Sequence, residues 1–118
     1  MSDRHNRIDY IELTVHDLDV AKAFYTGVFG WGFTDYGPGY SGIQGTPREQ
    51  GGLSVGEVAA PAKGSPLVVL YSDDLDGTLA AVTAQGGAVE TPPFDFPGGR
   101  RFHFRDPSGN VLAVWTES

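Results

Sequence analysis

A carboxylate and an imidazole lie on segments whose pattern is typical of β-strands. Glu12 falls in the alternating segment from Ile8 to Val15, and His103 falls in the alternating segment from Arg101 to Arg105. A carboxylate beside an imidazole can fix its tautomer and make it a general base near neutral pH. We interpret Glu12 and His103 as candidate catalytic residues for proton transfer, on the condition that the fold brings them face to face. The alternative is a polar wall or a hydrogen-bonded pair that only shapes a pocket.

Arginines flank this histidine. Arg101 and Arg105 share its side of an extended strand, and Arg100 directly precedes them. A guanidinium suits planar, two-pronged recognition of a carboxylate or phosphate, so one of these arginines could hold an anionic group of a ligand. The alternative is pairing with carboxylates of the chain itself, because arginines in an acidic protein seldom lack partners. The candidate carboxylate partners are Glu12, Glu90 and Asp95.

Aromatic side chains can offer flat faces to an aromatic or cationic ligand. Tyr10, Tyr71 and Trp115 are the candidates, with Trp31 as a weaker one, because aromatic residues more often serve the core. The full set of expected ligand-binding residues is Tyr10, Thr14, Leu67, Tyr71, Arg101, Arg105, Ala113 and Trp115.

The elements that must position these side chains follow the order βαβββ in the first half of the chain. A strand from Ile8 to Val15 precedes a helix that Asp17 caps and that ends at Gly30. Three short strand candidates follow, at 31–36, 40–44 and 53–58.

The second half predicts the same order. A strand at 67–71 leads to a helix that is capped by Asp74 and ended by Gly86-Gly87. A strand at 88–90 comes next, and Pro92, Pro93 and Pro97 predict irregular chain before Arg100. Strands at 101–105 and 110–115 then flank the turn Asp106-Pro107-Ser108-Gly109, which has the residues of a type I turn.

The two halves are one unit used twice. Asp17-Leu18-Asp19 returns as Asp74-Leu75-Asp76, and the same offset matches Leu13 with Leu70 and Gly30 with Gly87. Two copies are too few for a solenoid. We therefore predict a single domain over 1–118 that consists of two modules, 7–60 and 65–116.

These features resemble the vicinal oxygen chelate superfamily, the group of glyoxalase I, bleomycin-resistance proteins and extradiol dioxygenases. The resemblance rests on the two βαβββ halves, on Asp17-Leu18…Ala23-Phe24-Tyr25…Gly30 and on Asp106-Pro107-Ser108-Gly109-Asn110, and it covers nearly the whole chain. It implies an α+β fold of two tandem βαβββ modules, the glyoxalase/bleomycin-resistance/dioxygenase fold. In that fold a curved mixed sheet carries the helices on its convex face and a pocket on its concave face. It also implies a homodimer in which modules can pair across subunits.

The alternation along the strands agrees with such a two-faced sheet. The helix-facing positions are all apolar, and they comprise Ile11, Leu13, Val15, Val68, Leu70, Phe102, Phe104, Leu112 and Val114. The opposite face is mixed, as the wall of a binding pocket tends to be, and it holds the candidate residues named above.

The resemblance also gives the places of metal ligands, because metal-dependent members carry His or Glu at one position on each of four strands. Counted from Asp17, Asp74 and Asp106, and through the repeat, these positions are Tyr10, Gly56, Leu67 and Ala113. None is a usual ligand of a divalent first-row metal. Glu57 beside Gly56 would restore only one donor. We predict no metal site and no cofactor.

Composition narrows the function classes further. The net charge of −7 argues against nucleic acid as a partner and suits cationic or neutral ligands better. The absence of cysteine fits a reducing compartment, and no segment has the length of a membrane span or the pattern of a signal peptide. We expect a cytoplasmic protein without membrane or nucleic-acid partners.

The sequence leaves three functions open. The first is metal-independent binding of a small organic molecule in a pocket of the sheets, as the resemblance to bleomycin-resistance proteins implies. The second is a metal-independent enzyme that uses Glu12 and His103 for proton transfer on a carbonyl or phenolic metabolite. The third is the metal-dependent lyase or dioxygenase activity usual in the superfamily, which the four candidate positions disfavour.

Overall fold

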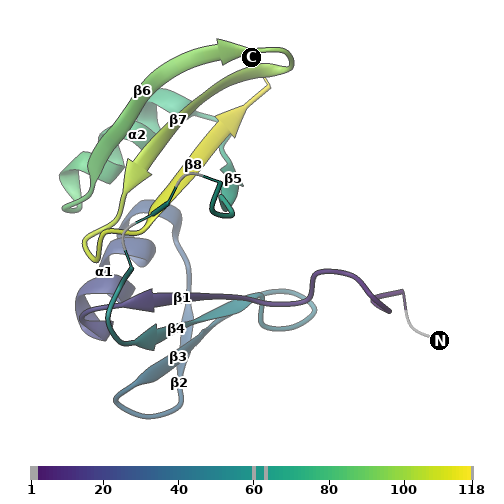
Figure 1. The fold of residues 1–118 in the computed structure, drawn as a ribbon, viewed down its shortest axis with the longest axis vertical. Helices are drawn as coiled ribbons and strands as arrows, with labels where there is room; N and C mark the ends of the chain where they lie inside the picture. Colours follow the sequence, from purple (N-terminus) through teal and green to yellow (C-terminus); the bar gives the residue numbers. More distant parts are fainter. Residues whose placement is uncertain (1–2, 60, 63, 118) are drawn as a thin grey trace.

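Each half of the chain forms a four-stranded sheet with one helix against it (Figure 1). The structure is a computed structural model, and it describes residues 3–59, 61–62 and 64–117. The first half comprises β1 (Ile11–Val15), α1 (Leu18–Phe29), β2 (Phe33–Asp35), β3 (Tyr40–Ile43) and β4 (Gly51–Val55). The second half comprises β5 (Val69–Tyr71), α2 (Leu75–Ala84), β6 (Ala88–Phe96), β7 (Gly99–Arg105) and β8 (Val111–Thr116).

The two sheets share one topology. Sheet A has the order β1-β4-β3-β2 and sheet B the order β5-β8-β7-β6, with the first pair parallel and the others antiparallel in each. This confirms the predicted α+β fold of two tandem βαβββ modules. The strands form two separate sheets in place of one continuous curved sheet. The module boundary expected at residue 60 lies outside the described residues.

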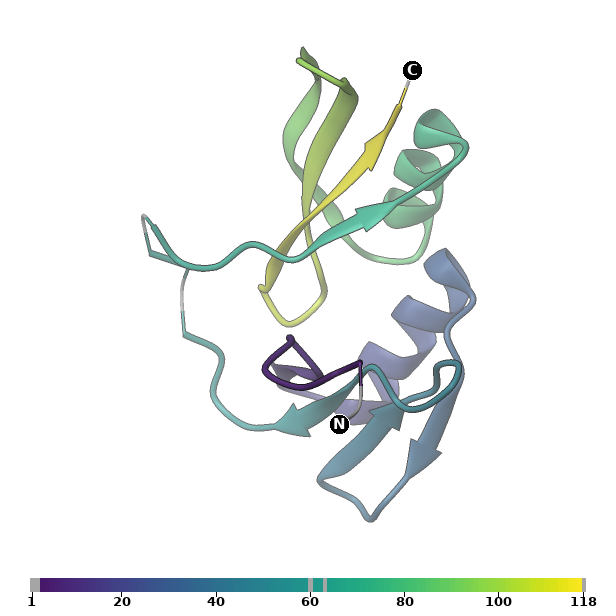
Figure 2. The ribbon, with the colours of Figure 1, turned by 90° about the vertical axis from the view of Figure 1, so that its right-hand side faces the viewer.

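The aspartates that mark the repeat both begin a helix. Asp17 accepts a hydrogen bond from the backbone nitrogen of Val20, and Asp74 accepts one from that of Gly77. Gly30 ends α1 with a φ of 72°, a left-handed conformation that glycine adopts without steric cost. Asp17 and Asp74 therefore both cap a helix, as the sequence predicts. The helices lie next to each other where the modules meet (Figures 1 and 2).

Strand β6 differs from the prediction. The strand runs over nine residues, Ala88–Phe96, and pairs with β7 on both sides of Pro92 and Pro93, where irregular chain was expected. The prolines are tolerated because β6 is the edge of sheet B, where one side of the strand needs no donors, and because the register shifts between Val89 and Thr91 and again before Phe94. This strand consequently carries two phenylalanines, Phe94 and Phe96, to the edge of the sheet.

The main core lies between α1, α2 and one face of sheet B. Its buried residues are Phe24, Tyr25, Leu75, Val82, Phe102, Phe104, Leu112 and Val114. The last four are predicted helix-facing residues, so the predicted faces of β7 and β8 are confirmed. Ile11 is the exception, because 41% of it stays exposed. Ile11 lines a small apolar pocket of about 90 Å³ between the modules together with Leu13.

The turn between β7 and β8 joins the two modules. The Asp106 carboxylate is buried and accepts a 2.7 Å hydrogen bond from the Tyr25 hydroxyl of α1. The backbone nitrogen of His16 donates to Ser108 Oγ at 2.9 Å, and Asn110 Nδ2 donates to the Thr14 carbonyl at 2.8 Å. Three hydrogen bonds thus attach this turn of the second module to β1 and α1 of the first.

Candidate functional site

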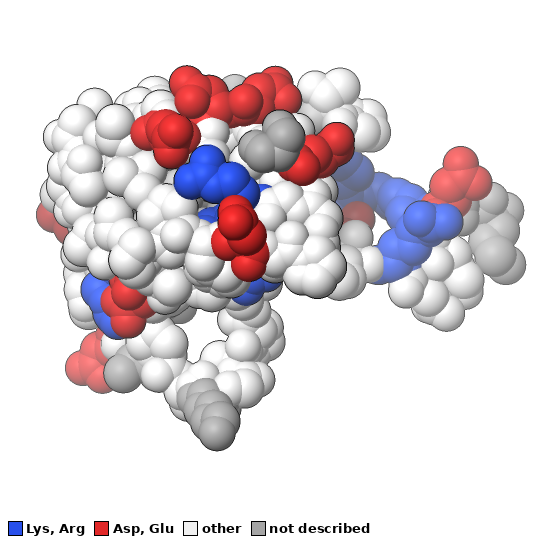
Figure 3. Space-filling view, turned by 90° about the horizontal axis from the view of Figure 1, so that it is seen from above, with Lys and Arg blue, Asp and Glu red and all other residues white. Residues whose placement is uncertain are grey.

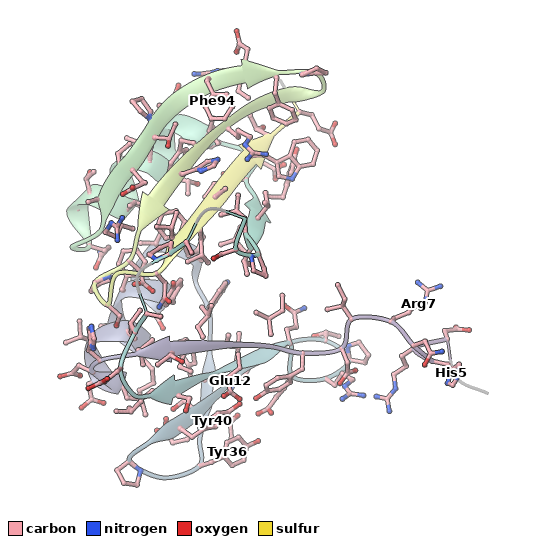
Figure 4. The ribbon with its side chains drawn as sticks, viewed as in Figure 1. His5, Arg7, Glu12, Tyr36, Tyr40 and Phe94 are labelled. Atoms are coloured by element: carbon pink, nitrogen blue, oxygen red, sulfur yellow. The ribbon has the colours of Figure 1, made fainter. Side chains whose placement is uncertain are left out.

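The structure places the two candidate catalytic residues on different sheets. Glu12 lies on β1 of sheet A, and His103 lies on β7 of sheet B. Figure 4 shows Glu12 beside Tyr36 and Tyr40 on the lower sheet, whereas Phe94, which neighbours His103, lies on the upper sheet. Between these two described residues no hydrogen bond is formed. The expected pairing of Glu12 with His103 is therefore not made within one protomer, because β1 belongs to sheet A and β7 belongs to sheet B.

A pocket lies on the exposed face of sheet B. It has a volume of about 220 Å³ and is lined by Val69, Phe96, Arg101 and Trp115, which come from four different strands. Register explains the grouping, since Arg101 pairs with Trp115 across β7 and β8. Tyr71 packs edge-on against the Trp115 ring with centroids 5.1 Å apart, and Phe96 does so at 6.1 Å.

Arg101 is the polar centre of this pocket. Its guanidinium lies over two rings of β6, 5.5 Å from the Phe94 centroid and 5.7 Å from the Phe96 centroid. Its Nε donates to His103 Nε2 at 3.2 Å, and its Nη2 lies 2.9 Å from the same atom. The rings and the imidazole fix the guanidinium in place while leaving part of it open to the pocket.

His103 is held in its neutral form by its surroundings. Burial lowers the pKa of the imidazole below its ordinary value of 6.5, and the Arg101 charge lowers it further, against an opposing effect of Glu90. A neutral ring can accept the hydrogen bonds of Arg101 at Nε2, which leaves the proton on Nδ1. His103 therefore serves Arg101 as an acceptor and has Nδ1–H as its remaining donor.

We predict that the stability of the protein falls in mild acid because of His103. In the unfolded chain His103 regains its ordinary pKa of 6.5, so below that pH the unfolded state binds a proton that the folded state resists. The free energy of unfolding should decline as the pH falls below about 6.5, and a His103→Gln variant should decline less. Urea denaturation between about pH 5 and pH 8 measures both slopes. Equal slopes for the two proteins would contradict the assignment.

The neighbouring arginines have carboxylate partners. Arg105 lies 3.0 Å from Glu90 and also donates to the Gly109 carbonyl, while Arg100 lies 3.7 Å from Asp95. Arg100 and Arg105 therefore pair with carboxylates of the chain itself, which was the alternative to binding a ligand. Viewed from above, the basic side chains on the body of the molecule lie beside acidic ones (Figure 3). Arg105 is thus less suited to a ligand than its position on the strand predicted.

A second polar group covers the exposed face of sheet A. The Tyr40 hydroxyl donates to Glu12 at 3.2 Å and shares a hydrogen bond with the Tyr10 hydroxyl, and Tyr36 donates to Glu49 at 2.6 Å. Burial, and then the bonds to Tyr10 and Glu12, raise the pKa of Tyr40 well above its ordinary value. Tyr10 and Glu12 are thus both hydrogen-bonded to Tyr40. This group belongs to the first module, whereas the pocket lies on the second.

The remaining predicted ligand residues fall around these two groups. Ala113 is fully buried beneath the sheet B face, opposite Val69 and His103 in register. Leu67 precedes β5 and is half-buried, and Thr14 lies on β1 of sheet A. Sequence reasoning missed Phe94 and Phe96, because their strand was expected to be irregular. Their spacing of two was a signal of a shared face.

The residues at the superfamily's metal positions do not fit a metal. Tyr10, Gly56, Leu67 and Ala113 offer one phenol and no imidazole or carboxylate, and Tyr10 is hydrogen-bonded to Tyr40. Across the described ranges 3–59, 61–62 and 64–117, no group of three or more His, Cys, Asp or Glu side chains could hold one ion. The absence of a metal and of a cofactor stays a prediction.

Two further observations bear on where a ligand can go. A larger hollow, about 570 Å³, lies beside the start of α1 between Asp17 and Asp35, and none of the residues that line it is Phe, Tyr or Trp. Neither α1 nor α2, the helices of the described residues, has the length and apolar character to cross a membrane. The pocket of sheet B combines two aromatic walls, Phe96 and Trp115, with the charged Arg101.

Comparison with known proteins agrees with this fold. Residues 7–114 match the family model of the glyoxalase/bleomycin resistance protein/dioxygenase superfamily. A putative glyoxylase, CFP32 of Mycobacterium bovis, is 31% identical over an alignment of 121 residues that covers 95% of this chain and 46% of that protein. The anthracycline biosynthesis protein DnrV of Streptomyces peucetius is 31% identical over an alignment of 126 residues that covers 90% of this chain and 45% of that protein. The chain thus spans about half the length of these two relatives.

A solved structure shows the same architecture. The crystal structure of a glyoxalase/bleomycin resistance protein/dioxygenase family enzyme from Burkholderia phytofirmans superposes with a TM-score of 0.78 at 18% identity, covering 94% of this chain and 98% of that one. At this identity the likeness concerns the fold alone. Together with the match over residues 7–114, it shows that the chain belongs to the glyoxalase/bleomycin resistance protein/dioxygenase superfamily.

Proposed function

We propose that this superfamily member binds a small organic molecule, without a metal, on the exposed face of sheet B. One observation carries the proposal: large apolar side chains stay exposed together on this face, around a pocket. Val69, Tyr71 and Phe94 are 42%, 49% and 39% exposed, and they surround the hollow between Arg101 and Trp115. An apolar concave surface with one convergent charged group is typical of small-molecule sites.

Trp115 gives this proposal a direct test. The chain has two tryptophans, so a Trp31→Phe variant would report on the pocket alone. We expect at least one compound of a panel of small aromatic, anionic and cationic metabolites to change the Trp115 emission saturably and to raise the melting temperature, because a ligand that binds only the folded state stabilises it. A Trp115→Leu variant should lose the melting-temperature response to the same compound.

The panel should be run with and without divalent metals, which tests metal independence at the same time. Binding that appears only with a metal would contradict the metal-independent site. Binding that persists unchanged in the Trp115→Leu variant would place the ligand elsewhere, and the absence of any response across the panel would contradict the function itself.

The second candidate function is proton transfer by a metal-independent enzyme. The neutral state of His103 favours it, since a general base must be unprotonated at working pH. Glu12 lies on the other sheet of the protomer, so joint use of the two residues requires Glu12 of a second copy. Catalysis of this kind predicts that His103→Gln lowers kcat by about 100-fold or more with KM little changed, whereas a binding protein keeps its affinity.

A homodimer is part of the proposal. The superfamily resemblance implies it, and relatives about twice as long as this chain, CFP32 and DnrV, have the length of two such units. The mass in solution, measured by light scattering during gel filtration, tests it directly. A cytoplasmic location, which the cysteine-free sequence favours, is likewise proposed.

A further inference from the structure

We propose that the molecule taken up by the sheet B face is a planar aromatic anion, of which an aryl carboxylate is the simplest form. The inference rests on the proposed function and names the chemical class of its ligand. Arg101 would bind the carboxylate, and the rings of Phe96 and Trp115 would pack against the aromatic part. Three features of the pocket support it.

The first feature is the charge of Arg101, which is not neutralised. Four other basic side chains have a carboxylate oxygen within 4.0 Å, and these are Lys22, Arg48, Arg100 and Arg105. Among the described residues none supplies such a partner to Arg101, although the chain carries a net charge of −7. A half-buried cation without a counter-ion in an acidic protein favours an anionic ligand over a cationic one.

The second feature is the geometry of the guanidinium. It has five N–H donors, and the Nε–H together with one Nη2–H is directed at His103 Nε2. The end of the fork, formed by Nη1 and the second Nη2 hydrogen, has no acceptor assigned to it in the part of the chain that the structure describes. This edge has the two parallel donors that a carboxylate accepts in a two-pronged arrangement. The histidine thus orients the arginine and leaves the edge of the guanidinium formed by Nη1 and Nη2 for a ligand.

The third feature is the shape of the walls. Phe94 and Phe96 lie against the guanidinium, and Trp115 is the partner of Arg101 in register, so the charge stands among flat rings. A pocket of about 220 Å³ with such walls suits one or two fused rings better than a flexible chain, because planar groups lose little conformational freedom on binding.

This local charge reverses the expectation from composition. The net charge of −7 favoured cationic or neutral ligands, but Glu90 and Asp95 of β6 lie in ion pairs with Arg105 and Arg100, and Glu12 lies on sheet A. A cation in this pocket would meet the Arg101 guanidinium directly. Recognition follows the nearest charge, because more distant exposed charges are screened within about 10 Å.

Matched probes test the inference by isothermal titration calorimetry. 2-Naphthoate, 2-naphthamide and 2-naphthylmethylamine share one ring system and differ only in charge. We expect the carboxylate to bind at least about 10-fold more tightly than the amide, and the amine more weakly than both. Arg101→Gln should abolish the preference for naphthoate over the amide, and Arg101→Lys should reduce it. Arg100→Gln, the neighbouring arginine paired with Asp95, should leave the preference unchanged.

The outcomes separate the inference from the function on which it rests. Equal affinities for carboxylate and amide, tighter binding of the amine, or a preference that survives in both Arg101 variants would overturn the anionic ligand class while leaving a binding site in place. Failure of all three probes to bind, together with no response across the metabolite panel, would overturn the proposed function as well. Circular dichroism of each variant verifies that it is folded, and Arg101→Lys keeps the test available should Arg101→Gln not fold.

Discussion

Asp106→Ala is expected to lower the free energy of unfolding by about 3–5 kcal/mol, because the change would leave several buried donors without an acceptor. Asp106 is 4% exposed, and its Oδ1 accepts from the backbone nitrogens of Ser108 and Asn110, both at 2.9 Å. Its Oδ2 accepts from the Tyr25 hydroxyl and from Asn110 Nδ2. One carboxylate therefore shapes the turn and attaches it to the other module.

Urea denaturation measures this loss, and two further variants divide it. Tyr25→Phe removes only the hydrogen bond from α1 to Asp106 and should cost less, about 1–2 kcal/mol. Asp95→Ala is the matched control, since Asp95 is exposed and lies 3.7 Å from Arg100, and its effect should stay within about 0.5 kcal/mol. A loss for Asp106→Ala no larger than that of the control would show that the Asp106 carboxylate does not stabilise the turn and its bond to α1.

The turn shows where sequence reasoning succeeded and where it stopped. The residues Asp106-Pro107-Ser108-Gly109 predict a type I turn, and the turn is present between β7 and β8. Local preferences of this kind act over four residues, and so do the caps of Asp17 and Asp74. The bond from Asp106 to Tyr25 joins residues far apart in the chain, and no local pattern contains it. The fold class could be predicted, whereas the contacts between modules could not.

The candidate site divides in the same way. Alternation along β7 and β8 places Arg101, His103 and Trp115 on one face, and the structure has them there. The expected partner Glu12 fails to join them because strand periodicity gives the face of a residue and says nothing of which sheet it belongs to. Phe94 and Phe96 were missed because prolines normally interrupt a strand, and only the position of β6 at the sheet edge tolerates them.

The same alternation predicts losses of stability of very different size for neighbours on β7. Phe104→Ala should lower the free energy of unfolding by about 3–5 kcal/mol, the usual cost of a cavity left by a phenylalanine. Phe104 is fully buried and its ring centroid lies 6.0 Å from that of Phe24 of α1 and 5.7 Å from that of Phe29. The helix cannot move to fill the space without breaking its contact with α2, so little of the cavity should close.

His103→Ala, one residue away on the same strand, is the matched comparison. His103 is half-buried on the opposite face of β7, where Arg101 also lies, and its removal leaves no closed cavity there, so near neutral pH the loss should stay below about 1 kcal/mol. Urea denaturation of both variants at pH 7 measures the contrast, and similar losses would contradict the assigned faces. If the contrast holds, side chains on the exposed face of sheet B can change without unfolding the protein. That independence is what allows one scaffold to carry different ligand sites, and it makes variants of Arg101 and Trp115 informative about binding.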